Sequence, residues 1–382
     1  MKKIKAIVVD DSAFMRKVVE DILNTDPEIE VVGTAKDGKE AVELTKSLKP
    51  DVITMDVEMP IMNGLEATKI IMQTCPAPIL MLSAVTREGS ETTLKALENG
   101  AVDFIQKPSG SISLDIREIS EKITKKVKEV SKSTVRPIKL TERFQTSENS
   151  KKETNSPNLN VENKKTENTV NQNAVRNPKI DETLSKIGIM IGSSTGGPPV
   201  VSEIISRLST DMPPIFIVQH MPAGFTRVFA ERIDRISKLK VVEASNGTLV
   251  KPNHVYIAPG DTQMLLKKRG NNIYIEIDPN MPKLHGTKPT VDITAEYVAN
   301  IYGNNSIGII LTGIGKDGAI GMRNIKEKGG FTIGQNKESC IVYGMPKTAY
   351  ELNALNDVLP PSQIPKKIEK CVEKYTQKLG SR

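Results

Sequence analysis

The chain has 382 residues, of which 38% are hydrophobic, and this length is enough for two ordinary domains. Its three cysteines lie far apart without a CxxC pair, which argues against a disulfide framework and against a zinc site. The formal net charge of +7 comes from scattered lysines with few aromatic residues among them, so charge alone does not indicate nucleic-acid binding, and we expect no nucleic-acid partner.

The N-terminal residues argue against a secretory signal. Met1–Lys5 is basic, but the apolar stretch that follows is short and ends at Asp10-Asp11. No apolar run approaches the roughly 20 residues that a membrane helix needs. We therefore expect a cytoplasmic protein that is not inserted in a membrane.

Residues 1–130 alternate short apolar runs with helical patterns. The apolar runs predict buried strands at Ile4–Val9, Glu30–Ala35, Val52–Met55, Ile79–Leu82 and Val102–Ile105. The helical patterns predict helices at Ala13–Leu23, Lys39–Leu48, Leu65–Gln73, Glu88–Asn99 and Ile116–Val130. Five βα units of this kind predict a doubly wound α/β domain, in which helices cover both faces of a parallel sheet.

Residues 131–184 differ from this pattern in composition. Stretches such as 146–152 and 168–173 are polar and nearly free of large apolar side chains. Such a segment cannot bury enough surface to offset the entropy lost on ordering. We expect a disordered polar linker, with short helical pieces allowed near its ends.

The alternation resumes at Ile187 and predicts a second doubly wound α/β domain over residues 185–382. Strands are expected at Ile187–Ile191, Ile215–Gln219, Lys240–Val242, Ser306–Leu311 and Phe331–Ile333. Helices are expected at Pro199–Leu208, Phe225–Ile236, Ile293–Tyr302, Ala319–Lys328 and Pro346–Glu351. The runs Val255–Ala258, Met264–Lys267 and Ile273–Ile277 predict a small strand or hairpin region.

Five polar residues stand at the ends of strands in the first half, namely Asp10, Asp11, Asp56, Ser83 and Lys107. The carboxyl ends of parallel strands face one crevice, and carboxylates that meet there repel one another unless a hard cation such as Mg²⁺ lies between them. A carboxylate so placed can attack a phosphoryl group, which a hydroxyl and an ammonium group would then stabilise. Each residue alone would be an ordinary loop residue, but the five together indicate a phosphoacceptor site.

The first half closely resembles the receiver domain of response regulators, which has a flavodoxin-like fold. The resemblance covers residues 1–125 and rests on Val9–Ser12, Met55–Pro60, Asn63-Gly64, Ser83-Ala84 and Lys107-Pro108. It implies that Asp56 is the phosphoacceptor and that Ser83 and Lys107 support the phosphoryl group. It also implies that Asp11, Asp56 and the Glu58 carbonyl hold Mg²⁺, with Asp10 supporting, and that a histidine kinase is the phosphodonor.

A glycine-rich turn, Gly192–Gly197, follows a buried strand and opens a helix in the second half. It fits the G-x-S-x-G nucleophile elbow with Ser194 at the centre. Alone, such a turn favours phosphate binding at a helix N-terminus, as in nucleotide folds. A nucleotide site would, however, have Lys-Ser/Thr after the glycines, where this chain has Pro198-Pro199.

Two further strand-end residues favour hydrolysis. His220 ends the next strand, and Asp317 lies between a later strand and its helix. With Ser194 as nucleophile, His220 as general base and then acid, and Asp317 orienting the imidazole, the three would form a Ser-His-Asp triad, which needs no cofactor.

The second half resembles the catalytic domain of the chemotaxis protein-glutamate methylesterases, the CheB family, which has a Rossmann-like sheet. The resemblance rests on segments 191–198, 219–226, 256–260, 289–292, 311–313, 317–319 and 343–346. It implies hydrolysis of glutamate methyl esters on methyl-accepting chemoreceptors, deamidation of receptor glutamines, and the triad Ser194, His220 and Asp317. Ile314, Lys316 and Thr287 depart from the residues usual in the family.

The two halves together predict a phosphorylation-activated hydrolase in chemotaxis adaptation. Two alternatives remain at this point. A DNA-binding output domain would need a helix-turn-helix with a basic recognition helix, and none is visible. A nucleotide-binding output domain would use the glycine-rich turn at Gly192–Gly197 for phosphate.

Overall fold

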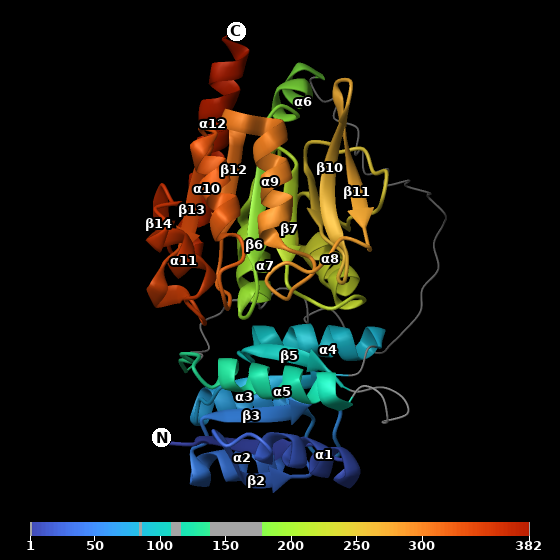
Figure 1. The fold of residues 1–382 in the computed structure, drawn as a ribbon, viewed down its shortest axis with the longest axis vertical. Helices are drawn as coiled ribbons and strands as arrows, with labels where there is room; N and C mark the ends of the chain where they lie inside the picture. The colour runs from blue at the N-terminus through green and yellow to red at the C-terminus, as the bar shows by residue number, and fades with distance from the viewer. Residues whose placement is uncertain (1, 84–85, 108–115, 138–177, 382) are drawn as a thin grey trace, which may run out of the picture.

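The computed structural model describes residues 2–83, 86–107, 116–137 and 178–381, which form two α/β domains (Figure 1). The middle of the expected linker, residues 138–177, lies outside the described residues. Both domains have parallel sheets, as predicted. No helix in the described ranges is long and apolar enough to cross a membrane.

The N-terminal domain has a five-stranded sheet in the order β2-β1-β3-β4-β5, the flavodoxin-like order. Its strands are β1 (Ile4–Val9), β2 (Ile29–Ala35), β3 (Val52–Asp56), β4 (Ile79–Ser83) and β5 (Asp103–Gln106). Its helices are α1 (Ala13–Asn24), α2 (Gly38–Leu48), α3 (Gly64–Thr74), α4 (Arg87–Glu98) and α5 (Ile116–Val130). All ten elements lie within two residues of their predicted bounds, because buried parallel strands give continuous apolar runs.

Four helices of this domain begin at a side chain that caps the first turn. The side chains of Ser12, Asp37, Asn63 and Thr86 each accept a hydrogen bond from a backbone N–H of the helix that follows. Such caps satisfy N–H groups that have no partner within the helix. They therefore fix where each chain segment turns from the sheet into its helix.

The C-terminal domain has a seven-stranded parallel sheet in the order β14-β13-β12-β6-β7-β9-β8. Its strands are β6 (Gly188–Ser193), β7 (Ile215–Gln219), β8 (Lys240–Glu243), β9 (His254–Ile257), β12 (Ser306–Ile310), β13 (Phe331–Gln335) and β14 (Asp357–Leu359). Without β9 the order is that of the Rossmann fold, 3-2-1-4-5-6. The direction of winding reverses between β6 and β12, and ligands bind at such a switch point.

Helices cover both faces of this sheet, and a hairpin lies beside it. The helices are α6 (Pro178–Leu184), α7 (Gly197–Arg207), α8 (Phe225–Ile236), α9 (Val291–Tyr302), α10 (Ala319–Glu327), α11 (Met345–Glu351) and α12 (Ile364–Gly380). The antiparallel hairpin consists of β10 (Gln263–Arg269) and β11 (Asn272–Asp278). The hairpin was predicted, whereas the run before it, Val255–Ala258, which was grouped with the hairpin, belongs to the main sheet as β9.

The sequence analysis did not identify β14 or α12. Helix α12 buries Ile364, Ile368, Cys371, Val372 and Tyr375, whose spacing follows the helical period. Helix α6, inside the range expected to be linker, packs against α12.

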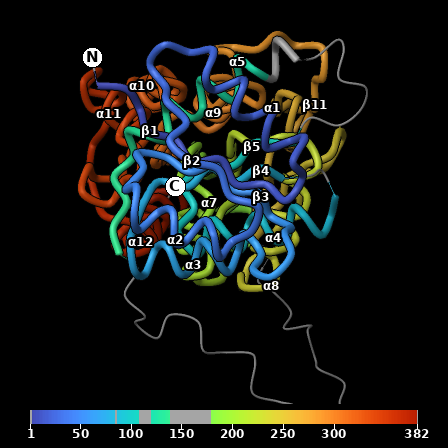
Figure 2. The backbone as a smooth tube through the Cα atoms, turned by 90° about the horizontal axis from the view of Figure 1, so that it is seen from below, coloured from blue at the N-terminus to red at the C-terminus, as the bar shows by residue number. Residues whose placement is uncertain are grey.

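The two domains are stacked so that one edge of the first sheet faces the second domain (Figure 1). Strand β5 and helices α4 and α5 lie on this side, next to the lower ends of β6 and β7 (Figure 1). The view from below shows the N-terminal domain lying across the C-terminal domain (Figure 2). One hydrophobic cluster includes buried residues of both domains, so the contact between the domains is continuous with the hydrophobic core.

Candidate functional site

Strand register explains why Ser194 and His220 come together. Ser193, the last residue of β6, pairs with Gln219, the last residue of β7. The next residue on each strand is therefore Ser194 on one and His220 on the other. Both residues line one cavity.

The two adjacent serines have different surroundings. Ser193 is fully buried, and its hydroxyl donates to Gln219 Oε1 at 2.5 Å. The backbone of Ser194 is held on both sides, since its N–H donates to the Thr312 carbonyl at 3.0 Å and its carbonyl accepts from Gln219 Nε2 at 2.9 Å. Ser193 is therefore tied into the interior, and Ser194 is the serine that reaches the cavity.

The turn after Ser194 requires glycine. Gly196 has a φ of +73°, and a Cβ there would lie 2.6 Å from Ile341 Cβ. Helices α7, α8 and α10 all begin after a glycine with positive φ and have no side-chain cap. Their first N–H groups therefore add positive potential at this edge of the sheet.

His220 and Asp317 form a direct pair. His220 Nε2 lies 2.7 Å from Asp317 Oδ2, and the side chains are only 12% and 3% exposed. The same carboxylate sits at the N-terminus of α9, where Oδ2 accepts the Val291 N–H at 2.8 Å and Oδ1 accepts the Asp292 N–H at 3.0 Å. These bonds fix Asp317 against rotation, so it holds His220 in a defined orientation.

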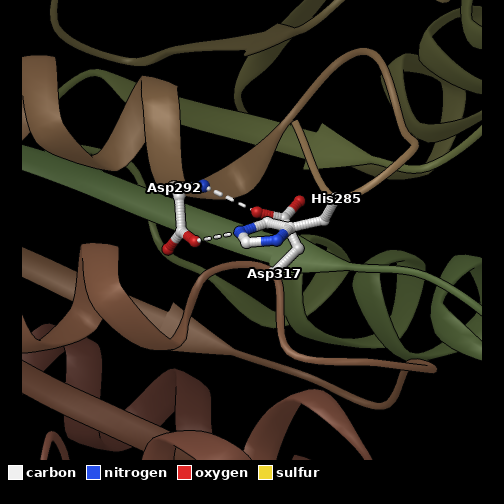
Figure 3. A group of neighbouring side chains, drawn as sticks. All are labelled: His285, Asp292 and Asp317. Atoms are coloured by element: carbon white, nitrogen blue, oxygen red, sulfur yellow. Dashed lines mark hydrogen bonds and ion pairs between the residues drawn. The ribbon is translucent and has the colours of Figure 1, made fainter. Parts of the chain in front are cut away.

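A second histidine–aspartate pair lies next to Asp317, as Figure 3 shows for His285, Asp292 and Asp317. His285 Nε2 lies 3.0 Å from Asp292 Oδ2, and Asp292 Oδ1 accepts the Gly321 N–H at 2.7 Å. Burial raises the pKa of Asp292, and the nearby Asp317 adds to the shift, although the Gly321 N–H and His285 oppose it. This pair was not predicted from the sequence, because it depends on a loop conformation.

Side-chain atoms of His285, Asp292 and Asp317 lie within 4.8 Å of one another, a spacing that would suit a metal ion. Both oxygens of each carboxylate, however, accept hydrogen bonds from backbone N–H groups or imidazoles. Donors that already point at these oxygens would repel a cation. The group is therefore a hydrogen-bonded network of acids and imidazoles.

The cavity that contains Ser194 and His220 has a volume of about 650 Å³ and lies between the two domains. The C-terminal domain contributes Ile314, Gly315 and the loop from Lys283 to Lys288. The N-terminal domain contributes β5 and residues of α5 such as Lys122 and Lys126. The N-terminal domain thus forms one wall of the candidate active site.

The acidic cluster of the N-terminal domain forms as predicted. Val9 pairs with Met55, so Asp10 and Asp56 follow neighbouring strands at the same height. Carboxylate oxygens of Asp10, Asp11 and Asp56 lie within 4.8 Å of one another. Burial raises the pKa of Asp56, an effect that Lys107 partly offsets. A divalent cation fits this excess of negative charge, and the chain offers the oxygen ligands that Mg²⁺ prefers.

Lys107 is held at the same cluster. Its ammonium lies 2.8 Å from Asp10 Oδ2 and 2.7 Å from Asp56 Oδ2. Burial favours the neutral amine, but the bonds with Asp10 and Asp56 outweigh it and raise the pKa of Lys107. Lys107 is therefore charged and already paired with the expected phosphoacceptor.

The remaining predicted residues of this cluster lie nearby. Ser83 pairs with Gln106 in the sheet, which places it beside Lys107, and its backbone carbonyl accepts the Lys107 N–H. Its hydroxyl is buried and takes part in bonds with α4, accepting from Thr93 Oγ1 at 2.7 Å and donating to the Gly89 carbonyl at 3.3 Å. Glu58 lies two residues beyond β3 and is exposed.

The other end of β5 touches the turn that carries Ser194. The Val102 carbonyl accepts the Gly196 N–H at 3.1 Å, and the Asp103 carboxylate accepts the Thr195 hydroxyl. Lys126 of α5 lies 2.7 Å from Asp103 and 3.3 Å from the Thr195 hydroxyl. A buried polar network therefore joins the N-terminal domain to the residue next to Ser194.

Apolar and ionic contacts surround this network. The rings of Phe104 and Phe225 lie 4.4 Å apart between their centroids. Three ion pairs join α4 to α8 at the rim of the interface: Arg87 with Glu231 at 2.9 Å, Arg232 with Glu98, and Arg235 with Glu91 at 3.9 Å.

Comparison with known proteins shows to which family the chain belongs. The receiver-domain model of response regulators matches residues 6–117, and the CheB methylesterase model matches residues 189–368. A Methanococcus maripaludis protein, named protein-glutamate methylesterase/protein-glutamine glutaminase, is 62% identical over 98% of this chain and 99% of its own length. The chain belongs to the CheB methylesterase family. The expected family and the expected fold class are thereby confirmed.

A second relative matches over nearly the whole length of both chains. The Thermotoga maritima protein-glutamate methylesterase/protein-glutamine glutaminase is 43% identical over 97% of this chain and 98% of its own length. The crystal structure of the Thermotoga maritima CheB methylesterase catalytic domain is 43% identical, covers 49% of this chain and 98% of that chain, and has a TM-score of 0.47.

Proposed function

We propose that this chain is a protein-glutamate methylesterase that also deamidates glutamine, acts on methyl-accepting chemoreceptors and is activated by phosphorylation of its receiver domain. The observation that supports it most is the fixed His220–Asp317 pair in the same cavity as Ser194. Family membership supports the substrate class. We propose domains at residues 1–130 and 185–382, and a location in the cytoplasm, where a kinase would supply the phosphoryl group.

The geometry supports a role for each member of the triad. Because Asp317 occupies Nε2 of His220, Nδ1 is the ring nitrogen left to take the proton from Ser194. The Ser194 oxygen then attacks the side-chain carbonyl carbon, and His220 returns the proton to the leaving methanol or ammonia. Water cleaves the acyl-enzyme by the same proton transfers and leaves glutamate. Ile314 and Gly315 line the cavity, and their backbone N–H groups would stabilise the oxyanion.

The receiver would accept a phosphoryl group on Asp56. Asp11, Asp56 and the Glu58 carbonyl would hold Mg²⁺, with Asp10 beside them. When bound, Mg²⁺ supplies positive charge that neutralises the carboxylates and the incoming phosphoryl oxygens. Lys107, already 2.7 Å from Asp56, would pair with the new charge.

Two routes connect Asp56 to the active site. Strand β5 is followed directly by Lys107 and begins at Asp103, which holds Thr195 beside the nucleophile. The Ser83 hydroxyl is bonded to α4, whose ion pairs hold α8. A phosphoryl group on Asp56 would carry about −1.5 to −2 charges. If Ser83 and Lys107 turn toward it, the first route loses the present position of Lys107 at the end of β5, and the second loses the bond between the Ser83 hydroxyl and α4.

In the structure the receiver restricts access to Ser194, because it forms one wall of the cavity. A receptor is far larger than a cavity of about 650 Å³, so a docked receiver would exclude it. Phosphorylation would weaken docking and shift the population toward an open enzyme.

The test is the initial rate of methanol release from methylated receptor. Three samples are compared at equal concentration: the full chain, the full chain treated with acetyl phosphate and Mg²⁺, and residues 178–382, which retain α6. We expect the first to be slowest. Methanol release by none of them would refute the esterase, and equal rates in all three would refute control by the receiver.

A further inference from the structure

We propose that His285 is a specificity residue that selects the primary amide of glutamine over the methyl ester of glutamate. This inference rests on the proposed function, since it concerns the same cavity. His285 lines the cavity with Ser194 and His220, and 19% of its side chain is exposed. His285 therefore faces the same cavity in which a substrate side chain would bind at Ser194.

The pairing with Asp292 determines which hydrogen bond His285 offers. An ionised carboxylate only accepts hydrogen bonds, so the Nε2 of His285 that faces Asp292 carries the hydrogen. In the neutral ring the other nitrogen, Nδ1, is then an acceptor. Asp292 cannot turn away, because its other oxygen accepts the Gly321 N–H. Asp292 therefore fixes the tautomer of His285.

The loop that carries His285 is held in place as well. His285 has a φ of 55°, an uncommon conformation for a residue with a side chain. The turn is closed by the Thr287 N–H, which donates to the Leu284 carbonyl at 3.1 Å, and Lys288 Nζ donates to the Pro279 carbonyl at 2.6 Å. A rigid turn keeps the imidazole at one position in the cavity wall.

The two substrates differ in what they present to such an acceptor. A glutamine amide has two N–H donors, whereas the methoxy oxygen of an ester has only lone pairs. An imidazole acceptor would hold one amide N–H and orient the leaving nitrogen, while His220 protonates it. The same acceptor offers nothing to the methoxy group. The pair of His285 and Asp292 thus favours deamidation relative to ester hydrolysis.

The variant His285→Lys separates this role from a structural one. The lysine ammonium retains N–H donors for Asp292 but has no hydrogen-bond acceptor to replace Nδ1. His254→Lys is the matched control, since His254 is also half-buried but bonds to the Pro252 carbonyl away from the cavity. Full-length proteins are treated with acetyl phosphate and Mg²⁺. The substrates are one receptor cytoplasmic fragment with glutamine at a modification site and the same fragment with the methyl ester there.

We expect His285→Lys to lower ammonia release about tenfold, the effect of losing one hydrogen bond, and to change methanol release less than about twofold. His254→Lys should change neither rate. An equal fall in both rates, or an unchanged rate of ammonia release, would overturn the role of His285 while leaving the proposed function in place. Wild-type protein that releases methanol but no ammonia would overturn this inference and the deamidase part of the proposed function, and would leave the esterase part in place. Wild-type protein that releases neither product would overturn the proposed function, and this inference with it.

Discussion

Replacing Asp103 with alanine should activate the enzyme without phosphorylation. Asp103 is buried and accepts the Thr195 hydroxyl across the domain interface. Its ion pair with Lys126 lies within the receiver, so that pair is present whether or not the domains are docked. Only the bond to Thr195 is therefore lost specifically from the docked state.

The size of the effect follows from this bond. A hydrogen bond to a charged group contributes about 1.5–3 kcal/mol, and about 2 kcal/mol corresponds to a roughly 30-fold shift between docked and open enzyme. The basal rate of methanol release from methylated receptor should rise by up to this factor, limited by the rate of the phosphorylated wild type. Because the variant begins more open, its activation by acetyl phosphate should be correspondingly smaller.

The matched control is Asp26→Ala. Asp26 also pairs with a lysine of α5, Lys128, at 2.7 Å, but its carboxylate otherwise accepts the Glu28 N–H of the same domain, where that of Asp103 accepts the Thr195 hydroxyl of the other domain. It should leave the basal rate unchanged. If Asp103→Ala is folded by circular dichroism and has the basal rate of the wild type, the Thr195 contact does not restrain the enzyme. An equal rise in Asp26→Ala would show that general loosening of the receiver, and not the interface bond, causes activation.

Three further outcomes are expected. Ser194→Ala should lower methanol release by several orders of magnitude, whereas Ser193→Ala should retain turnover. Ser193→Ala should instead lower the free energy of unfolding by about 1 kcal/mol, because it loses the hydrogen bond to Gln219. The opposite ranking of rates would reassign the nucleophile. Asp56→Asn should take up no phosphoryl group from acetyl phosphate, and an adduct seen by mass spectrometry of the intact variant would contradict the assignment. Burial raises the pKa of Cys340 to about 12, so this thiol is protonated at pH 8. It should therefore resist iodoacetamide, while the partly exposed Cys75 reacts. Rapid labelling of Cys340, detected by peptide mapping, would show that its surroundings open.

Most of the fold could be predicted because its strands are buried on both faces. The strand Ile215–Gln219 and the helix Phe225–Ile236 were predicted to the residue. The position of β9 between β7 and β8 could not be, since it depends on which strand edges meet in space. Helix α12 had a usable signal in the spacing of its apolar residues, although interleaved lysines lower its mean hydropathy.

The candidate site was predictable where it depends on strand ends. Ser194, His220 and Asp56 each directly follow or end a strand, and register brings such residues together. The bond from His285 to Asp292 instead depends on a left-handed loop residue, which no periodicity reveals. The contact of Asp103 with Thr195 depends on how two separate domains meet.

The ion pairs between α4 and α8 connect enzyme control to the solution around it. Arg87 and Arg235 are largely exposed, at 72% and 58% of their side chains, so dissolved ions reach these pairs. Such attractions are screened over about 8–10 Å at ordinary ionic strength, whereas the buried bond of Thr195 with Asp103 is screened far less. The proposed opening of the two domains would therefore depend on a salt-insensitive centre and a salt-sensitive rim. A change in the ionic strength around the protein would shift the ratio of docked to open enzyme without any change in phosphorylation.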